Sequence, residues 1–175
     1  MSLRLNLGSG DSKIDGFVNV DLDHKKGDAH WDISHRFPYE DGTVDEIWML
    51  HILEHVKEFL HRRILEECFR VLKVGGILLI AYPEFKICAQ RYIDDWKGKK
   101  DFYKACIYGR QNTDLDYHVT LMDTDLFVPM LIECGFVNIE SVPEKEDQNT
   151  LLRCVRSETP QQTREDLLRD EIFHV

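Results

Sequence analysis

The stretch Leu5-Asn6-Leu7-Gly8-Ser9-Gly10 decides the fold of this chain, together with a second apolar run, Phe17-Val18-Asn19-Val20-Asp21-Leu22, that follows it closely. The first run stops at a Gly-x-Gly turn, and the second stops at a carboxylate. A strand that ends in small residues lets a ligand approach the backbone closely. A neighbouring strand that ends in Asp offers an acceptor to a pair of ribose hydroxyls. The two runs therefore predict a nucleoside-shaped pocket at the carboxyl ends of two parallel strands.

Length and charge narrow the kind of protein. A chain of 175 residues with 43% hydrophobic residues is long enough for one domain with a proper core. The net charge of −10 argues against a nucleic-acid surface built on bulk positive charge and against binding to acidic membranes. No stretch approaches the roughly 18 apolar residues of a membrane span, and the N-terminus runs straight into a strand, so we expect no signal peptide. The five cysteines form no Cys-x-x-Cys pair, which favours reduced thiols in a cytoplasmic protein.

Runs with strand character alternate with helical periodicity along the chain. Between 56 and 73 the apolar residues fall on one stripe of period 3.6, which predicts an amphipathic helix. Gly75-Gly76 ends it and an all-apolar strand follows, which is half of a crossover unit in a parallel sheet. In all, we expect strands at Arg4–Leu7, Phe17–Leu22, Ala29–Ile33, Glu46–Leu50, Ile77–Tyr82, Phe136–Val142 and Leu151–Val155, and helices at Val56–Lys73, Phe85–Trp96, Asp101–Ile107 and Asp123–Cys134.

Several motifs in this order resemble the class I S-adenosylmethionine-dependent methyltransferases, and among them the small subgroup that starts with Leu-Asn-Leu-Gly-x-Gly. Besides 5–10 and 18–22, the matching pieces are Asp32-Ile33, Phe37-Pro38 through Asp45, His51-Ile52-Leu53-Glu54-His55-Val56, 69–76 and 131–136. The resemblance implies an α/β fold: a Rossmann-like, doubly wound, mostly parallel seven-stranded sheet with a C-terminal antiparallel hairpin, in a single domain over residues 1–156. Residues 157–175 are a charged C-terminal tail, which we expect to be partly helical or disordered.

The resemblance also assigns roles to single residues, with S-adenosyl-L-methionine as the cofactor. Gly8 and Gly10 would pass under its methionine and ribose, and Asp21 would bind the ribose hydroxyls. Asp32 would accept a hydrogen bond from the adenine amine. His51, just past the fourth strand, would face the transferred methyl group, which makes it the candidate catalytic residue. The complete expected cofactor set is Asn6, Gly8, Ser9, Gly10, Asp21, Leu22, Asp32, Ile33 and His51.

Two departures from the family pattern affect the site. The family's common acidic residue before the glycine turn is Asn6 here, which can hydrogen-bond but supplies no charge to the methionine ammonium. Only ten residues separate Gly10 from Asp21, and a full crossover helix with its turns needs a dozen or more. We therefore expect the first helix to be one turn or absent. The acceptor pocket is then open, or is completed by the insertion 86–116, by a homodimer or by a partner subunit.

Each role has a purely structural alternative. Asp32 can cap the turn that follows it, and His51 can be a packed loop histidine. Glu54 and His55 can cap and pair near the next helix, and His118 can be structural.

Two other site classes compete for the same residues. His51-x-x-Glu54-His55 matches the inverted zinc-peptidase signature. That chemistry needs both histidines on one helical face, and His51 follows a buried strand directly, so we expect no metal. Dinucleotide binding would need a third glycine at Lys13 and a long helix after it, and both are missing.

The sequence thus predicts methyl transfer, with the acceptor left open. The acidic composition favours a small molecule, a sugar intermediate or a protein over nucleic acid. The alternative is a non-catalytic, cofactor-binding regulatory or partner protein, which the shortened first crossover would suit. The chemistry mainly needs an aligned acceptor, and a base such as His51 is needed only where the acceptor arrives protonated.

Overall fold

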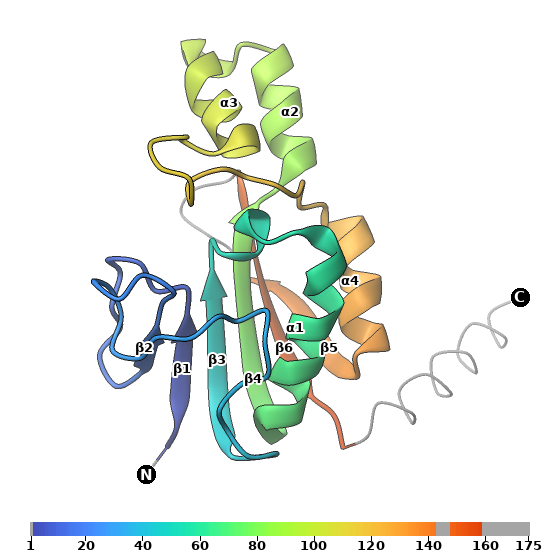
Figure 1. Cartoon of the computed structure of the whole chain (residues 1–175). Coiled ribbons are helices and arrows are strands. Elements are labelled where there is room, and N and C mark those ends of the chain that lie inside the picture. Colours follow the sequence, from blue (N-terminus) through green and yellow to red (C-terminus); the bar gives the residue numbers. More distant parts are fainter. Residues whose placement is uncertain (1, 143–147, 159–175) are drawn as a thin grey trace, which may run out of the picture.

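The computed structural model describes residues 2–142 and 148–158, and its centre is a mixed sheet of six strands in the order β2-β1-β3-β4-β6-β5 (Figure 1). β1 to β4 run parallel to one another, whereas β6 is antiparallel to both β4 and β5. The strands are β1 (Arg4–Leu7), β2 (Val18–Val20), β3 (Val44–Leu50), β4 (Leu72–Pro83), β5 (Phe136–Val142) and β6 (Asn149–Arg156).

Helices follow the periodicity in the sequence. The amphipathic segment is α1, which ends at Val71 and leads directly into β4, earlier than the glycine pair that we expected to end it. Asp123 caps α4 by accepting the N–H of Asp125 at 2.9 Å. The helices are α1 (Glu58–Val71), α2 (Phe85–Ile93), α3 (Lys100–Tyr108) and α4 (Thr124–Glu133), with 3-10 turns η1 (Leu53–His55) and η2 (Trp96–Gly98). In the described part of the chain, no helix has the length and hydropathy that a membrane span requires.

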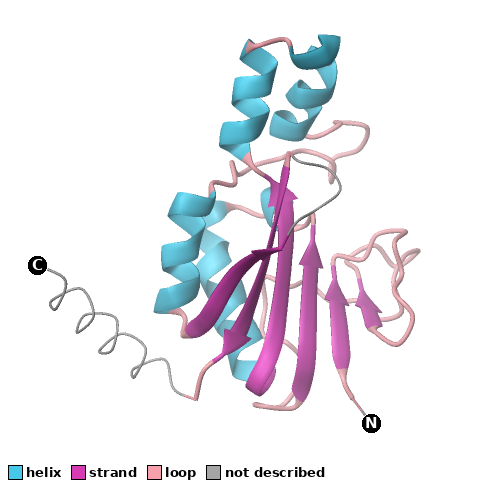
Figure 2. Ribbon diagram, turned by 180° about the vertical axis from the view of Figure 1, so that it is seen from behind, coloured by secondary structure: helices cyan, strands magenta, loops and turns pink. Residues whose placement is uncertain are grey.

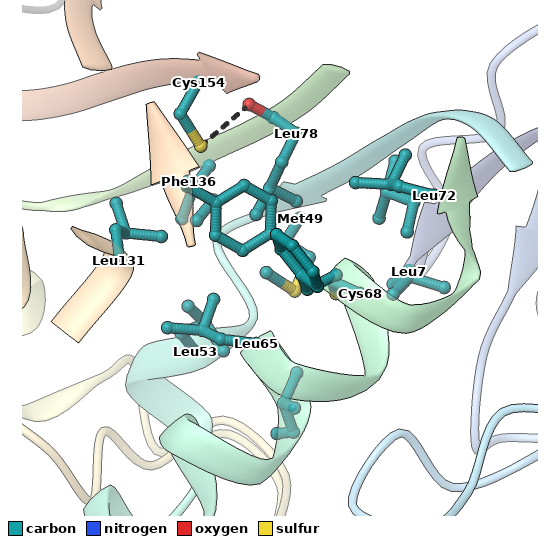
Figure 3. Close-up of a cluster of buried hydrophobic side chains, with 14 of the residues drawn as sticks. Leu7, Met49, Leu53, Leu65, Cys68, Leu72, Leu78, Leu131, Phe136 and Cys154 are labelled. Carbon is teal, nitrogen blue, oxygen red and sulfur yellow. Dashed lines mark hydrogen bonds between the residues drawn. The ribbon is translucent and has the colours of Figure 1, made fainter. Parts of the chain in front are cut away.

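The hydrophobic core lies between the sheet and the two helices α1 and α4. Alternate residues of the central strands, such as Met49 and Leu78, point into it and are fully buried. Figure 3 shows them packed against Cys68 of α1 and Leu131 of α4, with Phe136 among them. This layer holds the carboxyl ends of β1 and β3 in fixed positions, which is where the predicted site lies.

The other face of the sheet has no helix in the described residues, so the doubly wound expectation is wrong for this part of the chain. Figure 2 shows the strands from that side, with only loops beside β1 and β2. The connections β1–β2 and β2–β3, which would supply helices to this face, contain none. The first connection is too short for a helix, as the sequence predicted. Phe17 covers part of the face instead, with its ring 4.8 Å from that of Trp48.

The expected seventh strand is also absent from the described sheet. The segment 29–33 makes a single parallel bridge, between Ala29 and Val20. Asp28 binds the backbone and side chain of Asn19 just before it. Asp32 closes a tight turn after it. Local side-chain hydrogen bonds at both ends therefore leave too little extended chain to form a strand.

The insertion forms a helical hairpin, α2 and α3, that stands above the carboxyl ends of β3 and β4 (Figure 1). The loop that follows α3 returns along η1 before α4 begins. The insertion therefore lies over the end of the sheet where the acceptor was predicted to bind.

Candidate functional site

The turn after β1 keeps open space at the carboxyl edge of the sheet. Gly8 and Gly10 have positive φ angles of 68° and 53°, which residues with a Cβ rarely adopt. A Cβ on Gly8 would lie 2.4 Å from the Ile52 side chain, whereas a Cβ on Gly10 would meet nothing within 4 Å. Packing therefore requires glycine at position 8, and Gly10 leaves room for a ligand beside the backbone.

Ser9, between the two glycines, is buried with an unused hydroxyl. Its N–H donates to the Val20 carbonyl at 2.9 Å, which ties the turn to β2. Its Oγ is buried and has no hydrogen-bond partner among the described residues. Such an atom is costly, so the turn offers a bound ligand a polar contact that the protein itself does not use.

Asp21 connects the ends of β1 and β2. One carboxylate oxygen accepts the N–H of Gly10 at 2.7 Å, and the other accepts the N–H of Asp23 at 2.8 Å. Each oxygen keeps a second lone pair, and the side chain is half-buried. Asp21 is thus held rigidly beside the glycine turn with capacity to accept bonds from a pair of hydroxyls.

Asn6 faces into the protein instead of the turn. Its Nδ2 donates to Asn19 Oδ1 at 2.9 Å and to the Ser12 carbonyl at 3.1 Å. Asn19, its partner in the β1–β2 register, also accepts the Ile14 N–H at 2.8 Å. In this structure the Asn6 amide nitrogen anchors the loop that follows the glycine turn. Asn19 was not among the expected site residues, although a polar residue inside Val-Asn-Val is the signal for it.

The remaining residues of the expected cofactor set lie further along the same edge. Leu22 is 57% exposed, and Ile33 packs against the core. Asp32 accepts the Ser34 N–H at 2.8 Å and lies 3.4 Å from His35 Nδ1. Burial alone would raise the pKa of Asp32, but these contacts lower it. Asp32 is therefore ionised while it caps a turn, and it is open enough to accept a further bond.

His51 stands where β3 ends, in a left-handed conformation with φ of 56°. Its N–H donates to the Ala81 carbonyl at 2.9 Å, and its Nδ1 lies 3.3 Å from Glu54 Oε1. The ring is exposed, whereas Glu54 is almost completely buried. A buried carboxylate thus orients an accessible imidazole. His51 precedes η1, so it does not share a helix with His55.

The loop after α3 brings a further histidine to this edge. The Val119 N–H donates to the Glu54 carbonyl at 2.9 Å, and His55 Nδ1 lies 2.9 Å from the Tyr117 carbonyl oxygen. These bonds place His118 against His55, with ring centroids 4.8 Å apart. The two histidines are about sixty residues apart in the chain, so no spacing in the sequence could reveal the contact.

Part of the chain matches a known protein family. Residues 16–80 match the family described as methyltransferase domain. No curated protein matches the chain.

Solved structures share the fold over most of the chain. A methyltransferase from Thermotoga maritima, described as a possible histamine N-methyltransferase, is 16% identical to this chain with a TM-score of 0.62. The match covers 90% of this chain and 83% of the Thermotoga chain. A methyltransferase from Methanosarcina mazei is 16% identical with a TM-score of 0.61, and the match covers 88% of this chain and 92% of that chain. A methyltransferase from Archaeoglobus fulgidus is 15% identical with a TM-score of 0.63, and the match covers 89% of this chain and 86% of that chain.

The matched residues 16–80 include Asp21, Asp32 and His51. At these identities the likeness to solved structures concerns the fold alone. The match to the methyltransferase domain supports S-adenosylmethionine as the cofactor. The chain has the fold of the class I S-adenosylmethionine-dependent methyltransferases, and its residues 16–80 match their methyltransferase domain.

Proposed function

We propose that this protein is an S-adenosylmethionine-dependent methyltransferase that acts on a small molecule, a sugar intermediate or a protein. The observation that carries the proposal is the hydrogen bond that links the carboxyl ends of β1 and β2. Gly10 leaves open space and donates its N–H to Asp21, which keeps lone pairs for two hydroxyls. The buried, unpartnered Ser9 Oγ beside them fits a polar ligand at the same place.

The residues present fit the cofactor as follows. The glycine turn 8–10 would lie against its methionine and ribose, Asp21 would accept the ribose hydroxyls, and Asp32 and Leu22 would lie at the adenine. The bound cofactor supplies a methyl group already activated on a sulfonium. The protein then has to align the acceptor's lone pair with the methyl–sulfur bond, and orientation supplies most of the rate.

His51 is the residue that we assign to the acceptor side. It lies at the end of β3, the strand next to β1, with its ring exposed toward solvent. Its Nδ1 lies 3.3 Å from Glu54 Oε1, and we assign the imidazole to take a proton from an acceptor that arrives protonated. The net charge of −10 supports an acceptor other than nucleic acid.

Ligand-induced stabilisation tests the proposal directly. A ligand that binds only the native state must raise the unfolding temperature. We expect S-adenosylmethionine and its demethylated product to raise it at saturation, with NAD as the control nucleotide that does not. Equal unfolding temperatures with and without the saturating cofactor would overturn the assignment. Transfer of a labelled methyl group in an acceptor screen then separates an enzyme from a binding protein.

A further inference from the structure

A second cluster of potential ligand atoms lies beside His51, outside the residues assigned to the cofactor. Glu54 and His55 come from η1, and His118 comes from the loop after α3. One donor atom from each of these side chains lies within 4.8 Å of the others. Two donors on one tetrahedral zinc ion lie about 3.3 Å apart, so the side chains need to close by about 1.5 Å at most.

Both histidines are already held in the form that binds a metal. His55 Nδ1 lies 2.9 Å from the Tyr117 carbonyl oxygen, and His118 Nδ1 lies 3.0 Å from the Cys106 carbonyl oxygen. A carbonyl only accepts hydrogen bonds, so Nδ1 carries the proton in each neutral ring and Nε2 keeps its lone pair. Histidines that ligate metals commonly donate their other N–H to a backbone carbonyl in this way.

Glu54 supplies a carboxylate oxygen that the protein leaves unsatisfied. The side chain is 2% exposed, and its Oε1 lies 3.3 Å from His51 Nδ1. Its Oε2 is buried and has no hydrogen-bond partner among the described residues. Leaving a buried carboxylate oxygen unpaired is costly, and a cation at this position would remove the cost.

Two of the three candidate ligands border a small hollow. Glu54 and His118 line a hollow of about 10 Å³ together with Pro83, Phe85 and Met122 among others. That volume holds about one water-sized sphere, and His55 does not line it.

We propose that Glu54, His55 and His118 bind one divalent cation of the zinc class. Two imidazoles and one carboxylate are a donor set typical of catalytic zinc sites, in which a fourth position stays open for water or a substrate atom. The proposal reverses the expectation of no metal from the sequence. That expectation concerned a pair of His51 and His55, whereas the third ligand here comes from a distant loop. The three ligands lie outside the set of residues assigned to the cofactor.

Metal binding by the chelator-treated full chain tests the proposal. We expect calorimetric titration with zinc chloride, without any nucleotide, to give one equivalent of binding. Cobalt(II) should give visible absorption bands of a low-coordinate site at the same stoichiometry. His118→Asn should lower the affinity for zinc at least tenfold, and His55→Asn should do the same. Glu54→Gln is expected to weaken binding as well, as a third independent variant.

The chain offers a matched control in His24 and His30, whose rings also lie 4.9 Å apart. His24→Asn with His30→Asn should leave zinc affinity within twofold of the unmodified protein. An unmodified, folded protein that takes up no stoichiometric zinc would refute the site. Unchanged zinc affinity in a folded His118→Asn variant, checked by its unfolding transition, would refute it too. Because no cofactor is present, neither result depends on whether the protein is a methyltransferase.

Discussion

At the scale of single residues, Asp21 is the residue whose substitution tests the proposed cofactor site most directly. Its carboxylate already holds the N–H groups of Gly10 and Asp23 and has lone pairs left. Asp21→Ala should weaken S-adenosylmethionine binding by about 1.5–3 kcal/mol, the range for a hydrogen bond to a charged group. Calorimetry should therefore show an affinity lower by about tenfold or more. Asp23→Ala is the control, because Asp23 lies next to the site but is expected to keep the affinity within about threefold.

His51 should separate binding from catalysis. It lies at the end of β3, whereas Asp21 binds at the end of β2, two strands away in the sheet. His51→Ala should leave cofactor affinity nearly unchanged and, if the imidazole is the base, lower turnover by about 10²–10⁴-fold.

The pH profile tells a base from a residue that shapes the pocket. With a histidine base, activity of the unmodified enzyme should rise with pH, and His51→Ala should remove that rise. With a shaping role only, His51→Ala should raise the Michaelis constant and leave the profile unaltered. Unaltered kinetics of His51→Ala on the true acceptor would contradict both roles.

The turn after β1 is the element on which the site depends, and its two glycines serve different purposes. Gly10→Ala adds a Cβ in a left-handed conformation, which costs about 1–2 kcal/mol of folding stability, and fills the space left for the ligand. Gly8→Ala adds the same strain and a clash with Ile52 at 2.4 Å. Urea unfolding should therefore show the larger loss of stability for Gly8→Ala. Cofactor titration of folded Gly10→Ala should show weakened binding; full affinity in that variant would remove the glycine turn from the site.

Elements also show where local contacts overrule a strand pattern. The segment 29–33 has strand character in the sequence but makes one bridge to β2. Asp28 is held by Lys13 and Asn19, which lower its pKa to about 2. Side-chain hydrogen bonds such as those of Asp28 decide whether an edge segment pairs with the sheet. The pattern of apolar residues in the sequence does not reveal these bonds.

At the scale of the whole molecule, residues 157–175 differ from the rest of the chain in composition, because they form a charged tail beyond the family resemblance. All but Ser157 and Glu158 of this predicted tail lie outside the described residues. The candidate site is built from β1 to β4 and the insertion, so deletion of residues 160–175 should leave cofactor affinity within about threefold, a change below roughly 0.7 kcal/mol. Calorimetry on the shortened chain checks this. A folded but non-binding truncation would mean that Leu167, Leu168 and Phe173 contribute to the site.

The sequence by itself determined most of the strands, the parallel centre of the sheet and the pairing of the glycine turn with Asp21. These features depend on local patterns: apolar runs, helical periodicity, and residues at the ends of neighbouring strands. It also determined that the first connection is too short for a helix.

Only the tertiary structure decided the features that depend on contacts between distant segments. It showed that helices cover one face of the described sheet, that the Asn6 side chain supports a loop, and that His118 lies against Glu54 and His55. Each of these follows from where a loop returns to the sheet. A loop's path is set by packing and hydrogen bonds across the fold, such as that of Val119 with Glu54, and no sequence spacing encodes it.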